Sequence, residues 1–68
     1  MSNVFKKVEI VGTSSANFAD AVKSAVAEAS KTVRNISWFE VVEERGMVKD
    51  GNVQEFQVVL KVGFKLER

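Results

Sequence analysis

The chain has 68 residues with ten basic and nine acidic side chains, a net charge of +1, and neither cysteine nor histidine. A chain of this length forms a single domain, residues 1–68, with a thin core that buries only about 60% of the unfolded surface. Its composition excludes disulfides and the usual zinc ligand sets, and its small charge gives no strong field toward nucleic acids or anionic membranes. No apolar stretch approaches the roughly 20 residues of a membrane span, and the strand-like sequence starts at once. We therefore expect a soluble cytoplasmic protein.

The chain begins with a predicted strand. Residues 4–11 alternate imperfectly between apolar and charged side chains, which indicates a short strand. The segment Gly12–Ser15 is expected to break this strand and to supply a hydroxyl that caps the following helix. Ser14 is the predicted N-cap.

One amphipathic helix follows, from Ser15 to about Val33. Apolar residues recur there at spacings of three and four, and many are small, so the helix can lie close to a sheet. Arg34 and Asn35 are expected to close it, and the basic side chains of Lys31 and Arg34 suit the C-terminal dipole.

Two long strands complete the chain. Residues 36–48 are predicted to form the second strand, with a bulge or bend at Gly46. Residues 49–52, Lys-Asp-Gly-Asn, are typical of a tight hairpin turn. The third strand, residues 53–66, alternates cleanly, with one face fully apolar: Phe56, Val58, Leu60, Val62, Phe64 and Leu66.

The order β-α-β-β predicts an α+β fold. A right-handed crossover between the first two strands leaves a gap that the third strand fills antiparallel to both, giving a three-stranded antiparallel sheet of order 1-3-2 with the helix on one face. Fourteen strand residues reach about 46 Å, whereas a globule of this size is about 28 Å across. The hairpin therefore exceeds its own domain, and we expect a closed homo-oligomer that covers it.

Trp38, the single tryptophan, and Gln57 form the main candidate site. If Phe39 and Val41 face the helix, Trp38 points to the opposite face, which it shares with Gln57. A flat aromatic and a carboxamide could hold a planar heterocycle that forms hydrogen bonds. The alternative is that Trp38 only packs, in the core or against another subunit.

Other side chains carry weaker indications. The serines have no histidine to activate them, and the glycines are too far apart for a phosphate-binding loop. An acid/base pair among the glutamates and a basic phosphate-binding strip among the lysines are both possible from the residue types, but solvated strand faces explain these residues better. The residues in question are Glu40, Glu43 and Glu44, and Lys6, Lys7, Lys61 and Lys65. Phe5, Phe18, Phe56 and Phe64 are interpreted as core packing.

Nearly the whole chain resembles the dodecins, small flavin-binding proteins that assemble into hollow spheres of twelve subunits. The resemblance rests on residues 4–14 (VFKKVEIVGTS), 35–41 (NISWFEV), 45–46 (RG) and 55–64 (EFQVVLKVGF). The length, the β-α-β-β order and the positions of the single Trp38 and of Gln57 agree with it.

The resemblance implies a flavin site between subunits. Two stacked flavins would lie between a symmetry-related pair of Trp38 side chains, Gln57 would hydrogen-bond the pyrimidine edge of the isoalloxazine ring, and Arg45 would lie beside the flavin. Arg45 is typical of the bacterial-type members, which favour flavin mononucleotide (FMN) over riboflavin; FAD is a further candidate. Some dodecins also hold coenzyme A; no motif of this sequence indicates that site, although Lys65 could contact a phosphate.

On this basis the sequence predicts a homododecamer that stores flavin and suppresses its photochemistry, and that is not an enzyme. Two alternatives stay open. One is an oligomerisation module without a ligand, in which Trp38 is buried between subunits. The other is a flavin-dependent redox enzyme, which the absence of histidine and a site filled by a second flavin disfavour.

Overall fold

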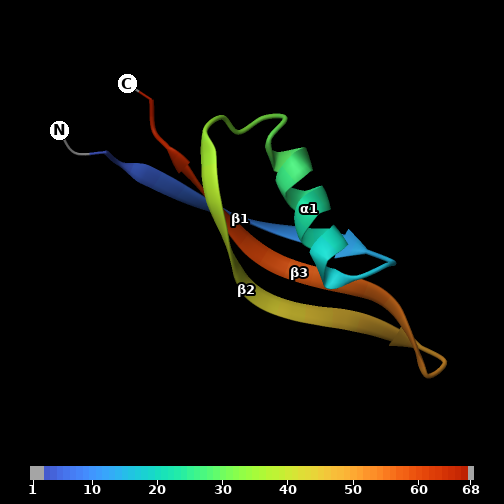
Figure 1. Cartoon of the computed structure of the whole chain (residues 1–68). Helices are drawn as coiled ribbons and strands as arrows, with labels where there is room; N and C mark the ends of the chain where they lie inside the picture. Colours follow the sequence, from blue (N-terminus) through green and yellow to red (C-terminus); the bar gives the residue numbers. More distant parts are fainter. Residues whose placement is uncertain (1–2, 68) are drawn as a thin grey trace.

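The computed structural model describes residues 3–67, which form three strands and one helix. The elements are β1 (Phe5–Ser14), α1 (Phe18–Ala29), β2 (Ile36–Lys49) and β3 (Asn52–Lys65) (Figure 1). The strands form one antiparallel sheet of order β1-β3-β2, and α1 lies across one face of it. The predicted α+β fold and sheet order are confirmed.

The prediction of Ser14 as the helix cap is wrong, because β1 runs on through Gly12 to Ser14. The cap is Asn17, whose Oδ1 accepts a hydrogen bond from the Asp20 amide at 2.7 Å. Ser14 instead forms the turn before the helix: its hydroxyl accepts from the Ala16 amide at 2.9 Å and donates to the Asp20 carboxylate at 2.7 Å. Ser14 and Asn17 therefore both accept amide hydrogens at the start of the helix, where the sequence pattern predicted Ser14 alone.

The helix is also shorter than predicted and ends at Ala29. The chain continues through turns in which the Val33 amide donates to the Ala29 carbonyl at 2.8 Å. Because this bond joins residues four apart, as in a helix, the helical spacing of apolar residues continues beyond the regular helix. Lys31 and Arg34 consequently lie outside the last helical turn, which contains no basic side chain. Asn35, with φ of 66°, turns the chain into β2, and asparagine tolerates this left-handed conformation well.

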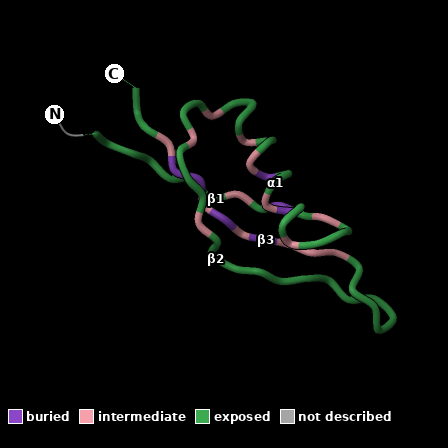
Figure 2. Tube along the Cα trace, viewed as in Figure 1, coloured by how far each residue is buried: buried purple, intermediate pink, exposed green. Residues whose placement is uncertain are grey.

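The core is small and lies between α1 and the middle of β3. It consists of five buried side chains: Ala21, Ala25, Val58, Leu60 and Val62. The helix approaches the sheet closely at Gly12, where an added Cβ would meet the Ala21 carbonyl oxygen and the Ala25 methyl group closer than 3.0 Å. Small residues on both sides therefore set the distance between helix and sheet. Figure 2 shows the buried segments along β3 and α1, whereas β2 is almost entirely exposed.

The β2–β3 hairpin extends beyond the rest of the molecule, as its length predicted. The molecule measures 55 × 20 × 13 Å, and α1 packs on β1 and β3. Asp50 and Gly51 both have positive φ, at 52° and 78°, which confirms the tight Asp-Gly turn at the hairpin tip. Large apolar side chains stay exposed along β2, among them Phe39 (50%), Val41 (46%) and Met47 (54%).

The predicted bulge at Gly46 is wrong, since Gly46 pairs in register with Phe56. Irregularities occur instead at Ile36/Trp38, Val41/Glu43 and Met47/Val48. Gly46 is needed for another reason: an added Cβ would lie 2.8 Å from the Glu55 carbonyl oxygen. The irregularity between Val41 and Glu43 leaves Val42 without a partner and shifts which side chains of β2 share a face.

Three of the four phenylalanines interpreted as core packing make aromatic contacts. Phe18 and Phe56 pack edge to face with ring centroids 5.1 Å apart, and this confirms their packing role. Phe5 is 44% exposed and contacts Trp38, so its assignment to the core is wrong. Among residues 3–67, no helix has the length and apolar character required to cross a membrane.

Candidate functional site

The strand register places all three candidate flavin contacts on one face of the sheet. Residues paired across antiparallel strands point to the same side. Trp38 pairs with Gly63 and Arg45 pairs with Gln57, and Gly63 and Gln57 both alternate with the buried residues of β3 that face the helix. The prediction that Trp38 and Gln57 share the face opposite the helix is therefore confirmed.

Trp38 lies on the surface of the sheet and is held there by two neighbours. Its ring contacts Phe5 edge to face, with centroids 5.3 Å apart and an interplanar angle of 61°. Its six-membered ring covers Gly63, which is buried although it faces away from the helix. Trp38 is nevertheless 38% exposed, an unusual amount for a large aromatic residue with nothing else to pack on.

Gln57 belongs to a chain of hydrogen bonds that fixes the orientation of its carboxamide. Its Oε1 accepts from Arg45 Nε at 3.0 Å, and its Nε2 donates to Glu55 Oε1 at 2.9 Å. Arg45 Nη1 also lies 3.6 Å from Glu43 Oε1. The carboxamide keeps a second N–H donor and a second acceptor lone pair, which is the complement that an imide-like ring edge requires.

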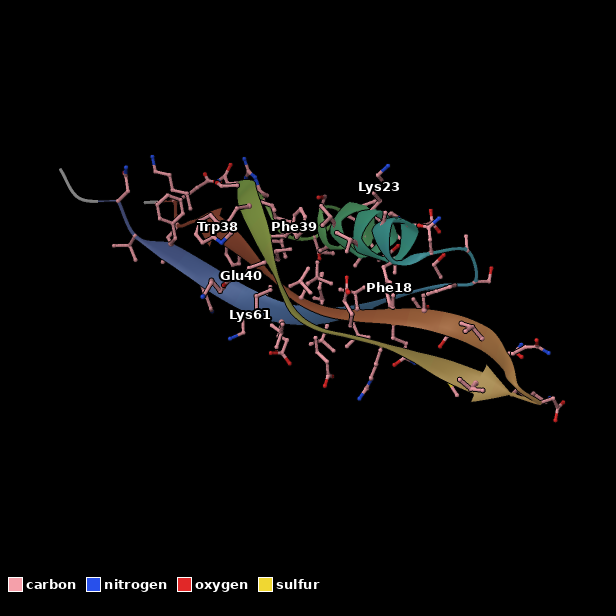
Figure 3. All side chains as sticks on the ribbon, turned by 60° about the horizontal axis from the view of Figure 1, so that its bottom comes forward. Phe18, Lys23, Trp38, Phe39, Glu40 and Lys61 are labelled. Atoms are coloured by element: carbon pink, nitrogen blue, oxygen red, sulfur yellow. The ribbon has the colours of Figure 1, made fainter. Side chains whose placement is uncertain are left out.

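An ion pair crosses the central strand beside Trp38. Lys7, which lies opposite Gly63 on β1, donates from Nζ to Glu40 Oε1 on β2. This hydrogen bond lowers the pKa of Glu40 below its ordinary value; desolvation opposes it, and the positive charges of Lys7 and Lys61 lower the pKa further. Figure 3 shows Glu40 and Lys61 on the side of the sheet away from α1.

Trp38 and Gln57 are not brought together within one chain. Gly63, the partner of Trp38, is six residues along β3 from Gln57, a separation of about 20 Å at the rise of a strand. This exceeds the length of a three-ring heterocycle. A ligand that touches both side chains would therefore have to lie between two subunits, with Trp38 from one and Gln57 from another.

The weaker candidates are not assembled into sites. Glu40 pairs with Lys7 and Glu43 with Arg45, while Glu44 pairs with Val58 on the helix side, so these carboxylates do not form an acid/base pair. The lysines do not form one strip either, since Lys6 pairs with Phe64 and faces away from Lys7. Within residues 3–67, no cluster of three or more potential metal ligands is present.

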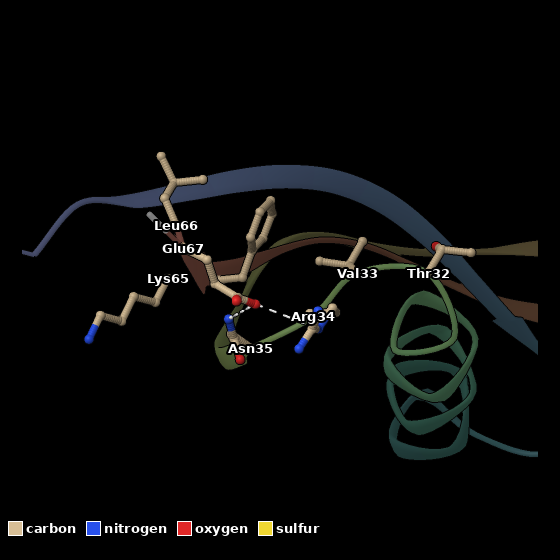
Figure 4. Close-up of a pocket in the computed structure, with 8 residues that line it drawn as sticks. Thr32, Val33, Arg34, Asn35, Lys65, Leu66 and Glu67 are labelled. Atoms are coloured by element: carbon tan, nitrogen blue, oxygen red, sulfur yellow. Dashed lines mark hydrogen bonds and ion pairs between the residues drawn. The ribbon is translucent and has the colours of Figure 1, made fainter.

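A shallow pocket of about 340 Å³ lies elsewhere, between the α1–β2 loop and the end of β3. Lys65 lines it, together with Arg34, Asn35 and Glu67 (Figure 4). The Glu67 carboxylate accepts from Asn35 Nδ2 at 3.0 Å and lies 3.5 Å from Arg34 Nε, so these contacts tie the C-terminal segment to the loop. None of the three candidate flavin contacts lines this pocket.

Sequence reasoning missed two residues of the candidate site. Gly63 interrupts an otherwise regular alternating strand, and such a glycine often marks a place where another group approaches the backbone closely. Glu55 is two residues before Gln57 and therefore on the same face, which was the available signal for its hydrogen bond.

The comparisons with known proteins agree with this architecture. The family model described as Dodecin matches residues 4–67. The dodecin of Thermus thermophilus is 52% identical over 67 residues, covering 98% of this chain and 97% of the relative. A crystal structure of a Thermus thermophilus protein has a TM-score of 0.94 at 51% identity and 98% coverage of both chains. The dodecin from Streptomyces davaonensis has a TM-score of 0.95 at 40% identity and full coverage of both. The chain therefore belongs to the dodecin family of small flavin-binding proteins.

Proposed function

We propose that this protein stores FMN in pockets between its subunits and suppresses the photochemistry of the bound flavin, without catalytic turnover. The observation that carries this proposal is the position of Trp38. Its indole is held against the sheet at Gly63, and the residue is 38% exposed. A rigid exposed aromatic face is a stacking surface for a flat heterocycle such as isoalloxazine.

The assembly supplies the second half of each pocket. Because Trp38 and Gln57 of one chain are about 20 Å apart, a flavin stacked on Trp38 would meet Gln57 from another subunit. At a two-fold axis the same contacts occur twice, so two flavins stack on each other between two Trp38 rings. This arrangement explains how one tryptophan per chain can enclose the ligand on both sides.

Gln57 and Arg45 have different tasks in this pocket. The free N–H and free lone pair of the Gln57 carboxamide would bond the pyrimidine edge and fix the orientation of the ring. Arg45 supplies a positive charge on the same face, which favours flavins that carry a phosphate over neutral riboflavin. Lys65 would make the corresponding phosphate contact if coenzyme A binds at a second position.

Contact between Trp38 and the flavin also provides a route for quenching. The excited flavin accepts one electron from the indole of Trp38, and the same electron returns to the indole oxidised in that step. No bond is made or broken, and both partners regain their ground states. The bound flavin therefore loses its excitation before it can react with oxygen or with other solutes.

Exposed apolar surface supports the assembly that these pockets need. Phe39 and Val41 lie on the helix side of β2, which α1 leaves uncovered, and both are about half exposed. A closed homododecamer would bury this surface and the projecting hairpin. The same surface also fits the alternative function, an oligomerisation module without a ligand.

One experiment separates these functions. The purified protein is incubated with FMN and run on a sizing column with absorbance and fluorescence detection. Quenched yellow flavin that elutes with a particle of about twelve subunits supports storage. A colourless particle of the same size contradicts the flavin site and favours the module, whereas a colourless monomer contradicts both. Flavin reduction by an added reduced substrate in stopped-flow measurements would instead indicate a redox enzyme.

A further inference from the structure

We infer that Gly63 is a positioning residue for the stacking tryptophan: it provides a flat, side-chain-free surface on β3 that holds the indole of Trp38 in the orientation a flavin needs. This inference rests on the proposed flavin site and adds to it a residue that does not itself touch the ligand.

The geometry at Gly63 is specific. A Cβ added there would lie closer than 3.0 Å to Cε2, Cζ2 and Cη2 of Trp38, a separation that real Cβ atoms essentially never show. These three atoms are consecutive in the six-membered ring and nearly equidistant from the added carbon. The carbon would therefore meet the face of the ring and not its edge. One face of the indole consequently packs directly on the backbone of Gly63.

The opposite face of the indole is therefore directed away from the sheet, where a planar ligand can stack. Phe5 contacts the ring edge to face from β1 and limits its sideways movement. Lys7 lies directly across from Gly63 on β1. Its ammonium group is held by the hydrogen bond to Glu40, so its side chain does not occupy the position of the indole. Together these contacts leave one orientation in which the ring is supported from below and open above.

Glycine otherwise has little reason to be at this position. It weakens the interior of a strand because it adds backbone entropy and no packing, and aromatic neighbours across the strands compensate by covering it. Here the compensation is Trp38, since Gly63 is buried in the structure although α1 is on the other side of the sheet. Any larger residue would push the indole off the sheet.

The test is a double-mutant cycle on the full-length protein with FMN as the probe. Gly63→Ala, Trp38→Ala and the double variant are compared by unfolding, near-ultraviolet circular dichroism and FMN titration. Gly63→Ala is expected to change the tryptophan spectrum without any ligand and to weaken FMN binding about tenfold or more. In the Trp38→Ala background, Gly63→Ala should have little effect on unfolding, because the group it displaces is gone.

Two outcomes would overturn the inference: an unchanged tryptophan spectrum and FMN affinity in Gly63→Ala, or an equal loss of stability with and without Trp38. If Gly63→Ala alone does not fold, folding of the double variant supports the inference and its failure to fold contradicts it. The spectrum without ligand keeps the two proposals distinct. A wild-type protein that binds no FMN contradicts storage, while a shifted spectrum in Gly63→Ala still supports the positioning of Trp38 by Gly63.

Discussion

Arg45 and Gln57 lie directly opposite each other on β2 and β3, and Arg45 Nε donates a hydrogen bond to Gln57 Oε1 at 3.0 Å. Glu55 completes the arrangement by accepting from Gln57 Nε2 at 2.9 Å. The oxygen of the carboxamide therefore points to Arg45 and its nitrogen to Glu55. Gln57 is oriented before any ligand arrives. Its carboxamide therefore does not have to be fixed in one of two orientations when a flavin binds.

Replacing Gln57 by leucine should weaken FMN binding about tenfold, because one or two hydrogen bonds of about 1 kcal/mol each are lost. The FMN that still binds should stay quenched, since Trp38 is unchanged. Fluorescence titration measures both quantities. Glu55→Gln is the matched comparison: it keeps the size of the side chain but permits the opposite amide orientation, and we expect a smaller loss of affinity. Fluorescent bound FMN in Gln57→Leu would contradict separate roles for the two residues.

Trp38→Ala should weaken FMN binding by about 1–3 kcal/mol per stacked ring, the range that alanine substitution gives for nucleobases stacked on aromatic side chains. The flavin that remains bound should recover its fluorescence because the electron donor is gone. Trp38→Phe is the control: it retains an aromatic ring for stacking but is a much poorer electron donor. We expect it to recover fluorescence while binding more tightly than Trp38→Ala. Undiminished quenching in both variants, measured by fluorescence lifetime, would disprove electron transfer from Trp38.

Phe39→Glu should prevent formation of the large particle. Phe39 is 50% exposed on the side of β2 that α1 does not cover, and a subunit interface there would bury the new carboxylate without a partner. Burying an unpaired charge costs several kcal/mol, enough to dissociate an assembly. Phe39→Leu keeps the surface apolar and should still assemble. Sedimentation velocity measures the particle size, and a Phe39→Glu particle of full size would exclude this surface from the interfaces.

The Lys7–Glu40 ion pair should make stability fall in acid. The pKa of Glu40 is lowered in the folded protein by its hydrogen bond to Lys7, so this carboxylate contributes stability above its unfolded pKa and loses that contribution as the pH falls through its folded pKa. Both side chains are nearly half exposed, which keeps the effect small. Lys7→Met should lower the melting temperature at neutral pH, and the difference from the wild type should shrink below about pH 4.

Melting curves of both proteins across this pH range test the pair. Glu40→Gln should resemble Lys7→Met, and the double variant should be no worse than either single variant, since the three changes remove one interaction. A difference between wild type and Lys7→Met that stays constant into acid would show that Lys7 acts through packing and not through the charge of Glu40.

The sequence alone determined the order of elements and the chemistry of the faces. The clean alternation of residues 53–66 identified β3 as the central strand, and the Asp-Gly turn fixed the hairpin. Both signals are local, because they depend on side-chain periodicity and on the backbone freedom of a few residues. The length of the hairpin likewise revealed that it would project beyond the domain.

The tertiary structure decided which residues of β2 share a face. Trp38 and Arg45 are seven residues apart, so strict alternation would put them on opposite sides of the sheet. The irregularity at Val42 reverses that parity and brings Arg45 to the face of Trp38, opposite Gln57. The same pairing seats the indole on Gly63 and separates it from Gln57 by about 20 Å. Register arises from hydrogen bonds between strands far apart in sequence, and no local pattern records where one residue is skipped.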